Sequence, residues 1–376
     1  MNNPFMDIAR TLENKYIVQW KENGNAVIGY TCSYLPDEIL YSMGILPFRM
    51  RGTGAGSTSI GDTYFGPFIC SMPKCILQLA GEGSYGFLDG AVVIPGCDSM
   101  RRMDDCWRKA GGDIEGALPE FFHHLGVPHK AVDYSLTWFR QEIEEFVAAV
   151  EKHFSVKINE DRLRESVKTY NRGRKLLREL QELRNLKDTP VSGAESLAVI
   201  LAGSAIPRDI FNSLLEEYLA ELRLRKNPGT KKRILLAGSA NDDVELLQLI
   251  EGDRAVVVAD NICFGTRFHP DLVNEDADPV SALAEHYLFR SECPRMFGDY
   301  KKRYSILREK IDSAGVDGVI LQNIRFCDLH GSENGLFERD LEKEGIPSMR
   351  LEREYGPMVE TGRVKMRVDA FLERIG

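Results

Sequence analysis

The sequence lacks several signatures that would assign it to a familiar class of protein. None of its eight cysteines forms a Cys-x-x-Cys pair, so zinc ribbons and thioredoxin-type redox sites lack their usual spacing. No Gly-x-x-x-x-Gly-Lys-Ser/Thr loop is present, and the glycine-rich stretch 52–61 lacks the glycine spacing and the following helix of a dinucleotide fingerprint. We therefore interpret 52–61 as a connecting loop, and we expect any use of ATP to belong to another polypeptide.

An excess of positive charge and long apolar runs are also absent. The 376 residues carry a formal net charge of −9, which argues against nucleic-acid binding because such proteins normally present a basic face. No apolar run approaches the roughly 18 to 20 residues of a membrane span, and residues 1–24 show no signal-peptide pattern. We expect a cytoplasmic protein that binds neither nucleic acid nor membrane. Thiols stay reduced in that compartment, so metal binding, catalysis or burial remains for the cysteines.

One stretch of the sequence occurs twice. Residues 87–98 contain Asp-Gly, an apolar run rich in β-branched residues and a turn into Cys97-Asp98, and residues 316–328 repeat this order up to Cys327-Asp328. Such runs indicate strands of a parallel sheet that helices cover on both faces. Each cysteine then follows the carboxyl end of a buried strand, where open α/β sheets form their binding crevices. A single cysteine could be a small buried hydrophobe, but the repeat predicts two similar lobes with one site between them.

The rest of the chain fits an α/β fold with parallel sheets. We expect a first lobe with an N-terminal helix at 1–137, a helical spacer at 138–230 and a second lobe with a C-terminal helix at 231–376. The predicted strands of the first lobe are 25–33, 45–51, 87–95 and 127–132, and those of the second lobe are 233–239, 255–260, 318–324 and 346–352. The spacer is predicted from its leucine-rich, charged pattern of helical period.

Three cysteines lie beside the predicted crevice. Cys70 begins a predicted helix, where the helix dipole favours a thiolate, and Cys97 and Cys327 follow strands. Three thiolates favour a soft metal site, either zinc or an iron–sulfur cluster, and leave one coordination position open. We expect the other cysteines to lie in the core, namely Cys75, Cys106, Cys263 and Cys293. Cys75 is also a candidate extra ligand, because it lies about one helical turn from Cys70.

In their order along the chain, these motifs resemble the 2-hydroxyacyl-CoA dehydratase / benzoyl-CoA reductase family. The matching stretches are 29–47, the segment around Cys70, 87–102, Cys327-Asp328 and 345–371, so the resemblance covers nearly the whole chain. It implies two flavodoxin-like (Rossmann-like) lobes with a [4Fe–4S] cluster in the cleft between them, held by Cys70, Cys97 and Cys327.

The resemblance also implies an activity and partners. Family members act on CoA thioesters: one electron forms a ketyl radical that expels the hydroxyl group of a 2-hydroxyacyl-CoA, or two electrons reduce an aromatic acyl-CoA. They are usually heterodimers of related subunits, and a separate ATP-dependent activator with its own cluster passes on electrons from ferredoxin or flavodoxin.

The polar residues of the site are less specified than the cysteines. Ser33 and Glu38 are candidates for facing the substrate, with a helix N-terminal cap as the alternative. Arg101 and Arg267 are candidates for binding CoA phosphates, with surface ion pairs as the alternative.

Three other interpretations stay open. The extra Cys75 is compatible with a sub-branch of homodimers that carry an [8Fe–9S] double-cubane cluster and reduce small molecules. The chain could also be a non-catalytic subunit that relays electrons to a related partner, or a zinc or flavin protein built on the same lobes. The sequence does not specify the acyl group, or whether the partner is a second copy or a different subunit.

Overall fold

The computed structural model describes residues 3–225, 231–268, 271–290, 292–356 and 361–376. Its strands are β1 (Val27–Tyr30), β2 (Leu46–Arg49), β3 (Gly90–Val93), β4 (Phe121–His124), β5 (Lys232–Gly238), β6 (Ala255–Asn261), β7 (Gly318–Ile324) and β8 (Ser348–Arg353). Its helices are α1 (Pro4–Arg10), α2 (Lys15–Glu22), α3 (Asp37–Ser42), α4 (Ser59–Tyr64), α5 (Ser71–Gly81), α6 (Asp98–Asp113), α7 (Asp133–Phe154), α8 (Glu160–Asn185), α9 (Gly193–Ala202), α10 (Arg208–Leu224), α11 (Val244–Glu251), the 3-10 turn η1 (Thr266–Phe268), α12 (Pro279–Leu288), α13 (Tyr300–Ser313), α14 (Asp328–Lys343) and α15 (Thr361–Arg374).

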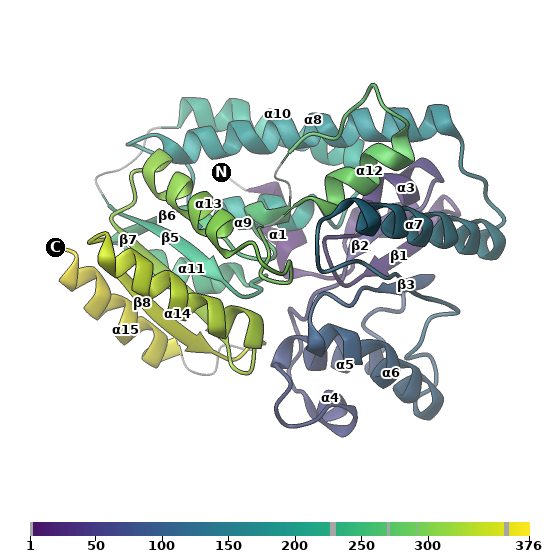
Figure 1. Cartoon of the computed structure of the whole chain (residues 1–376), viewed down its shortest axis with the longest axis horizontal. Coiled ribbons are helices and arrows are strands. Elements are labelled where there is room, and N and C mark those ends of the chain that lie inside the picture. The colour runs from purple at the N-terminus through teal and green to yellow at the C-terminus, as the bar shows by residue number, and fades with distance from the viewer. Residues whose placement is uncertain (1–2, 226–230, 269–270, 291, 357–360) are drawn as a thin grey trace.

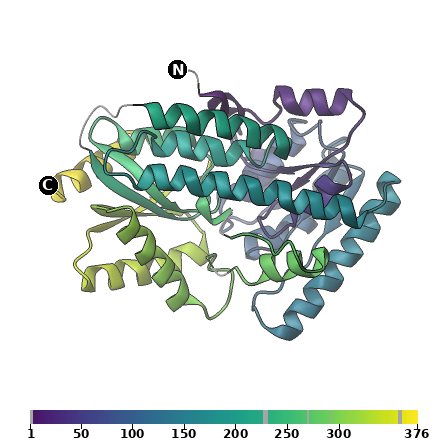
Figure 2. The same ribbon diagram turned by 90° about the horizontal axis from the view of Figure 1, so that it is seen from above.

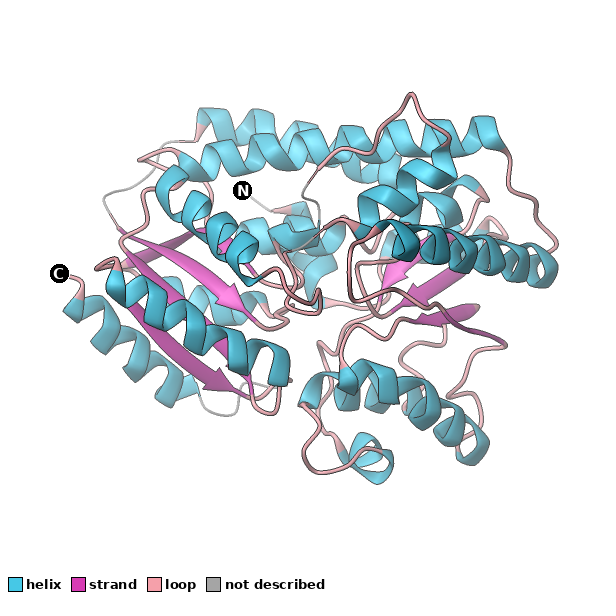
Figure 3. Cartoon of the chain, viewed as in Figure 1, coloured by secondary structure: helices cyan, strands magenta, loops and turns pink. Residues whose placement is uncertain are grey.

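The strands form two parallel sheets with the same topology (Figure 3). The first sheet has the order β2-β1-β3-β4 and the second has the order β6-β5-β7-β8, which is the first order moved on by four strands. β3 and β7 therefore occupy equivalent places, and they are the two strands that the repeated sequence predicted. This arrangement confirms the predicted α/β class and the two similar, flavodoxin-like lobes.

The strands at the centre of each sheet are buried, as their apolar sequences require. All residues of β1, β3 and β6 are buried, and so are the first five residues of β7. At the end of β5 the backbone of β7 comes very close. Gly238 has a φ of +121°, and a Cβ at this position would lie 1.9 Å from the carbonyl oxygen of Gln322. Only glycine fits this crossing of β5 and β7.

The helices of the middle segment join the two lobes. α8 and α10 run along the top of Figure 1 above both sheets, and Figure 2 shows them side by side. α8 packs against α3 of the first lobe and against β6 of the second, while α9 packs against α1 and β6. Within the described parts of the chain, no helix is long and apolar enough to cross a membrane.

Two local predictions were wrong. The fourth strand of the first lobe is Phe121–His124, not 127–132, because Pro128 has no N–H to donate to a ladder and the backbone of residues 121–124 pairs with β3. Residues 59–64 form α4 inside what was predicted to be loop. Ser59 starts this short helix beside α5, where the backbone N–H of Ile60 donates to the side chain of Gln78 at 2.7 Å.

Candidate metal centre

The three predicted cysteines lie at the N-termini of three helices. Cys70 is the residue before α5, Cys97 precedes α6 and Cys327 precedes α14. Cys97 and Cys327 also follow β3 and β7, so equivalent strand ends of the two lobes supply two of the thiols. The structure thus places the three thiols where both sheets end, at the position that the repeat predicted for them.

The electrostatics of these thiols show that they are near one another. Burial, and then the neighbouring Cys327 thiolate, raise the pKa of Cys70 to about 11. Burial, and then the Cys70 thiolate, raise the pKa of Cys97 well above its usual value. Burial also raises the pKa of Cys327. In each case a backbone N–H from the first turn of the following helix lowers the pKa in opposition. This set of donors suits a soft cationic group, which would deprotonate the thiols and remove the cost of burying them as anions.

An aromatic pair stands next to this thiol group. The ring centroids of Phe68 and Phe326 are 5.7 Å apart in an edge-on arrangement, and these residues come shortly before Cys70 and Cys327. Phe326 has a φ of +63°, a left-handed conformation that costs a bulky residue energy and is more often seen at functional sites than elsewhere. The turn after β7 is therefore strained immediately before its cysteine.

A second group of three cysteines surrounds a small cavity of about 30 Å³. Its thiols are Cys32, Cys263 and Cys293, and its walls also include Ser33, Tyr34, Arg267, Arg290 and Glu292. The sequence predicted core positions for Cys263 and Cys293 and did not single out Cys32. A usable signal was present for two of them, because Cys32 and Cys263 each lie two residues beyond the carboxyl end of a strand, β1 and β6 respectively.

Arginines contact this second group. The guanidinium of Arg49 donates to the Cys263 thiol and to the Cys263 carbonyl, each at 3.0 Å. Burial raises the pKa of Cys293 to about 11, and the charge of Arg267 opposes this rise. Buried cations beside thiols stabilise the thiolate form. The second group therefore has the same potential for soft ligation as the first.

The two groups of cysteines are adjacent. A Cβ at Gly96, the residue before Cys97, would lie 3.2 Å from the Cys32 sulfur. The Cys32 thiolate contributes to the raised pKa of Cys97, and the Cys263 thiolate contributes to that of Cys327. Six cysteines thus line one continuous region at the carboxyl ends of the two sheets. In the described residues, no group of three or more His, Cys, Asp or Glu side chains is arranged to hold a single metal ion.

The other predicted site residues are spread over different environments. Ser33 lines the small cavity, and its carbonyl accepts a hydrogen bond from Arg290. Glu38 is fully buried, pairs with Arg174 at 2.6 Å and accepts a hydrogen bond from the Tyr287 hydroxyl at 3.0 Å. The structure therefore puts Ser33 beside the cysteines and engages Glu38 in a buried ion pair.

The two predicted arginines and Cys75 also differ in their surroundings. Arg101 is exposed on α6. Arg267 is buried in the wall of the small cavity and donates to the carbonyls of Gly238 and Asn261, so it is not in a surface ion pair. Cys75 is fully buried, as expected for a core residue, and its thiol lies 3.7 Å from the Tyr355 carbonyl oxygen.

Comparison with known proteins places the geometry in context. Residues 32–375 match the family model described as 2-hydroxyglutaryl-CoA dehydratase, D-component. The chain is 24% identical over 375 residues to the (R)-phenyllactyl-CoA dehydratase beta subunit of Clostridium sporogenes, covering 99% of this chain and 98% of the relative. It is 28% identical to a subunit of the benzoyl-CoA reductase of Thauera aromatica, covering 82% and 81%. It is 23% identical to the putative dehydratase subunit YjiM of Escherichia coli, covering 96% and 94%.

Proposed function

The chain belongs to the family of the 2-hydroxyglutaryl-CoA dehydratase D-component, and we propose that it is an iron–sulfur subunit of an enzyme that acts on a CoA thioester. Cys70, Cys97 and Cys327 would hold a [4Fe–4S] cluster. The observation that supports this most strongly is the arrangement of these thiols at three helix N-termini, two of them on equivalent strand ends of the two lobes. The relatives named above are subunits of dehydratases and of a reductase.

The chemistry we propose is low-potential electron transfer to the thioester. When bound, a cluster of this kind supplies single electrons, which can drive either the dehydration of a 2-hydroxyacyl-CoA through a ketyl radical or the reduction of an aromatic acyl-CoA. This chain's own residues provide the surroundings. Burial of the thiols limits the access of water, and the backbone N–H groups of α5, α6 and α14 stabilise negative charge on the sulfurs.

We also propose partners for this chain. Each of the relatives named above is one subunit of a larger enzyme, which supports a related second subunit for this chain or, failing that, a second copy. The sequence has no phosphate-binding loop. We therefore assign ATP hydrolysis to a separate activator that takes electrons from ferredoxin or flavodoxin.

The second group of cysteines favours a specific second candidate function. If Cys32, Cys263 and Cys293 also ligate iron, the six adjacent thiols would hold a double-cubane [8Fe–9S] cluster in a homodimeric reductase of small molecules. The support for this candidate is the small cavity that these three thiols line next to the first group. It does not depend on Cys75, which is enclosed by Tyr355 and Gly52 on the other side of α5.

Counting iron and sulfide separates the two candidates. The protein would be purified without oxygen, and both elements measured per chain together with EPR and Mössbauer spectra. About four irons that are lost in Cys70→Ser, Cys97→Ser and Cys327→Ser but kept in Cys32→Ser, Cys263→Ser and Cys293→Ser support the [4Fe–4S] assignment. About eight irons with losses in both sets support the double cubane.

Cys106→Ser is the matched control, because Cys106 is half-buried on α6 and its thiol contacts the Tyr64 carbonyl at 3.4 Å. Iron content that is indifferent to all six substitutions, or stoichiometric zinc without sulfide, would contradict both candidates. A separate titration with acyl-CoA tests the role of the chain in catalysis. A change in the cluster's EPR signal indicates contact with substrate, and an unchanged signal indicates a subunit that only relays electrons.

A further inference from the structure

A second, much larger cavity lies away from the cysteines. It has a volume of about 650 Å³, within the usual range for small-molecule sites. Residues of α8, α9, α12 and α13 line it, together with Thr266 at the carboxyl end of the edge strand β6. Arg290 and Glu292 belong both to its wall and to the wall of the small cysteine cavity. The two cavities are therefore neighbours.

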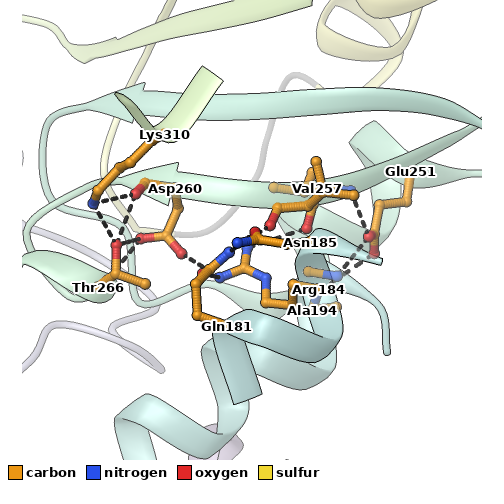
Figure 4. A network of polar contacts seen from close by, with 11 residues as sticks. Gln181, Arg184, Asn185, Ala194, Glu251, Val257, Asp260, Thr266 and Lys310 are labelled. Atoms are coloured by element: carbon orange, nitrogen blue, oxygen red, sulfur yellow. Dashed lines mark hydrogen bonds and ion pairs between the residues drawn. The ribbon is translucent and has the colours of Figure 1, made fainter. Parts of the chain in front are cut away.

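The inner end of the large cavity is rich in hydrogen-bond donors. The ammonium group of Lys310 donates to the Thr266 hydroxyl at 2.7 Å and to the Asp260 carbonyl at 2.9 Å (Figure 4). Arg184 lies beside it and pairs with the Asp260 carboxylate at 2.9 Å. The single carboxylate of Asp260 is thus engaged by Arg184, and Lys310 forms no ion pair with any carboxylate of the described residues. Burial lowers the pKa of Lys310 to about 8, although Asp260 opposes this shift.

Several polar atoms of the cavity wall have no partner among the described residues. They are the hydroxyl oxygen of Ser196, the Nε of Arg184 and the Nε2 of His286. The Ser196 side chain is only 1% exposed, so bulk water does not readily satisfy it. Unsatisfied buried polar groups are costly and are rare without a function. Their presence around one cavity indicates that the cavity is built for a polar ligand.

The remaining wall is apolar. Leu180 and Ile200 are buried on one side, while Phe289 is 39% exposed at the rim. A ligand that matches both parts has an anionic end and an apolar body. We propose that this cavity binds an organic anion, whose carboxylate or phosphate lies against Lys310 and whose apolar body extends along Ile200 and Phe289. This inference goes beyond the proposed function and uses none of its cysteines.

Isothermal titration calorimetry on the anoxic protein tests the proposal with three probes: hexanoate, inorganic phosphate and coenzyme A. We expect at least one of them to bind at a single site. Lys310→Met should weaken that binding about tenfold or more, as the loss of a charged hydrogen bond does. Phe289→Ala should weaken binding of hexanoate and leave binding of phosphate unchanged. Binding of hexanoate alone identifies the anion as a carboxylate, and binding of phosphate or coenzyme A identifies a phosphate ester.

Lys301→Met is the matched control, because Lys301 is an exposed residue of the same helix that does not line the cavity. Circular dichroism would verify that Lys310→Met is folded, and the exposed position of Phe289 keeps the test valid if it is not. Absence of binding by all three probes, or binding that neither variant weakens, would overturn the proposal. Iron is counted on the same preparations. Binding without iron would refute only the proposed function, and iron without binding would refute only this inference.

Discussion

A buried aspartate gives the fold a measurable dependence on pH. Asp37 is 3% exposed at the start of α3, and burial, followed by the charge of Glu38, raises its pKa to about 7. One of its carboxyl oxygens accepts a hydrogen bond from the Tyr30 hydroxyl at 3.0 Å. Its other oxygen has no partner among the described residues. The folded protein therefore favours the neutral acid.

The sign of the effect follows from proton binding. Between the unfolded pKa of 3.8 and the folded pKa of about 7, the folded state holds the Asp37 proton and the unfolded state does not. The free energy of unfolding therefore falls as the pH rises through this window and levels off above it. The whole window corresponds to about 4 kcal/mol, and the part between pH 5.5 and 7 corresponds to about 2 kcal/mol. Asp37→Asn removes the titrating group, and its amide oxygen can still accept from Tyr30.

Urea denaturation at pH 5.5 and pH 8 measures this difference. We expect the wild-type protein to lose about 2 kcal/mol more stability than Asp37→Asn between these two pH values. Asp276→Asn is the control, because Asp276 is an exposed loop residue and its variant should follow the wild type. Equal losses in the wild type and Asp37→Asn would refute the assignment of a raised pKa to Asp37.

Three further predictions concern single positions. Glu38→Gln should cost about 3–5 kcal/mol in urea unfolding, because it leaves Arg174 charged and buried; the double variant with Arg174→Met should recover stability, and a silent Glu38→Gln would contradict this reasoning. Phe326→Gly should be about 1 kcal/mol more stable than Phe326→Ala in thermal unfolding, since only glycine adopts φ +63° without strain, and the reverse order would disprove the strain. Cys75→Ala should keep its full iron content by chemical analysis, because the thiol is enclosed in the core, and a loss of iron would reinstate it as a ligand.

The sequence was most informative where a pattern was repeated. Residues 87–98 and 316–328 predicted two equivalent buried strands, and β3 and β7 confirm them at the same place in both sheets. The sequence was least informative at an edge. β4 carries two phenylalanines and two histidines, a pattern without clear alternation, while Val127 to Val132 looked more strand-like despite Pro128. Pairing with β3 decides this choice, and pairing is a tertiary property that a local pattern does not contain.

The candidate site shows the same division. Cys97 and Cys327 could be predicted because each ends a copy of the repeat. Cys293 follows α12 and no strand precedes it, so its place beside Cys32 and Cys263 comes from the packing of distant segments. The large cavity was also beyond prediction, because it arises between helices from the middle segment and the second lobe.

The strand order explains why two groups of thiols share one region. In the order β2-β1-β3-β4, the chain leaves β1 toward one side of the sheet and leaves β3 toward the other. The crevice between the carboxyl ends of β1 and β3 is the usual binding position of such sheets. Cys32 follows β1 and Cys97 follows β3, so this one crevice carries a thiol of each group. If only one group ligates iron, the other three thiols remain beside it and within reach of the same ligand. The substitutions at Cys32 and Cys97 therefore test the same crevice from its two sides, and the iron count of Cys32→Ser decides between a single and a double cluster.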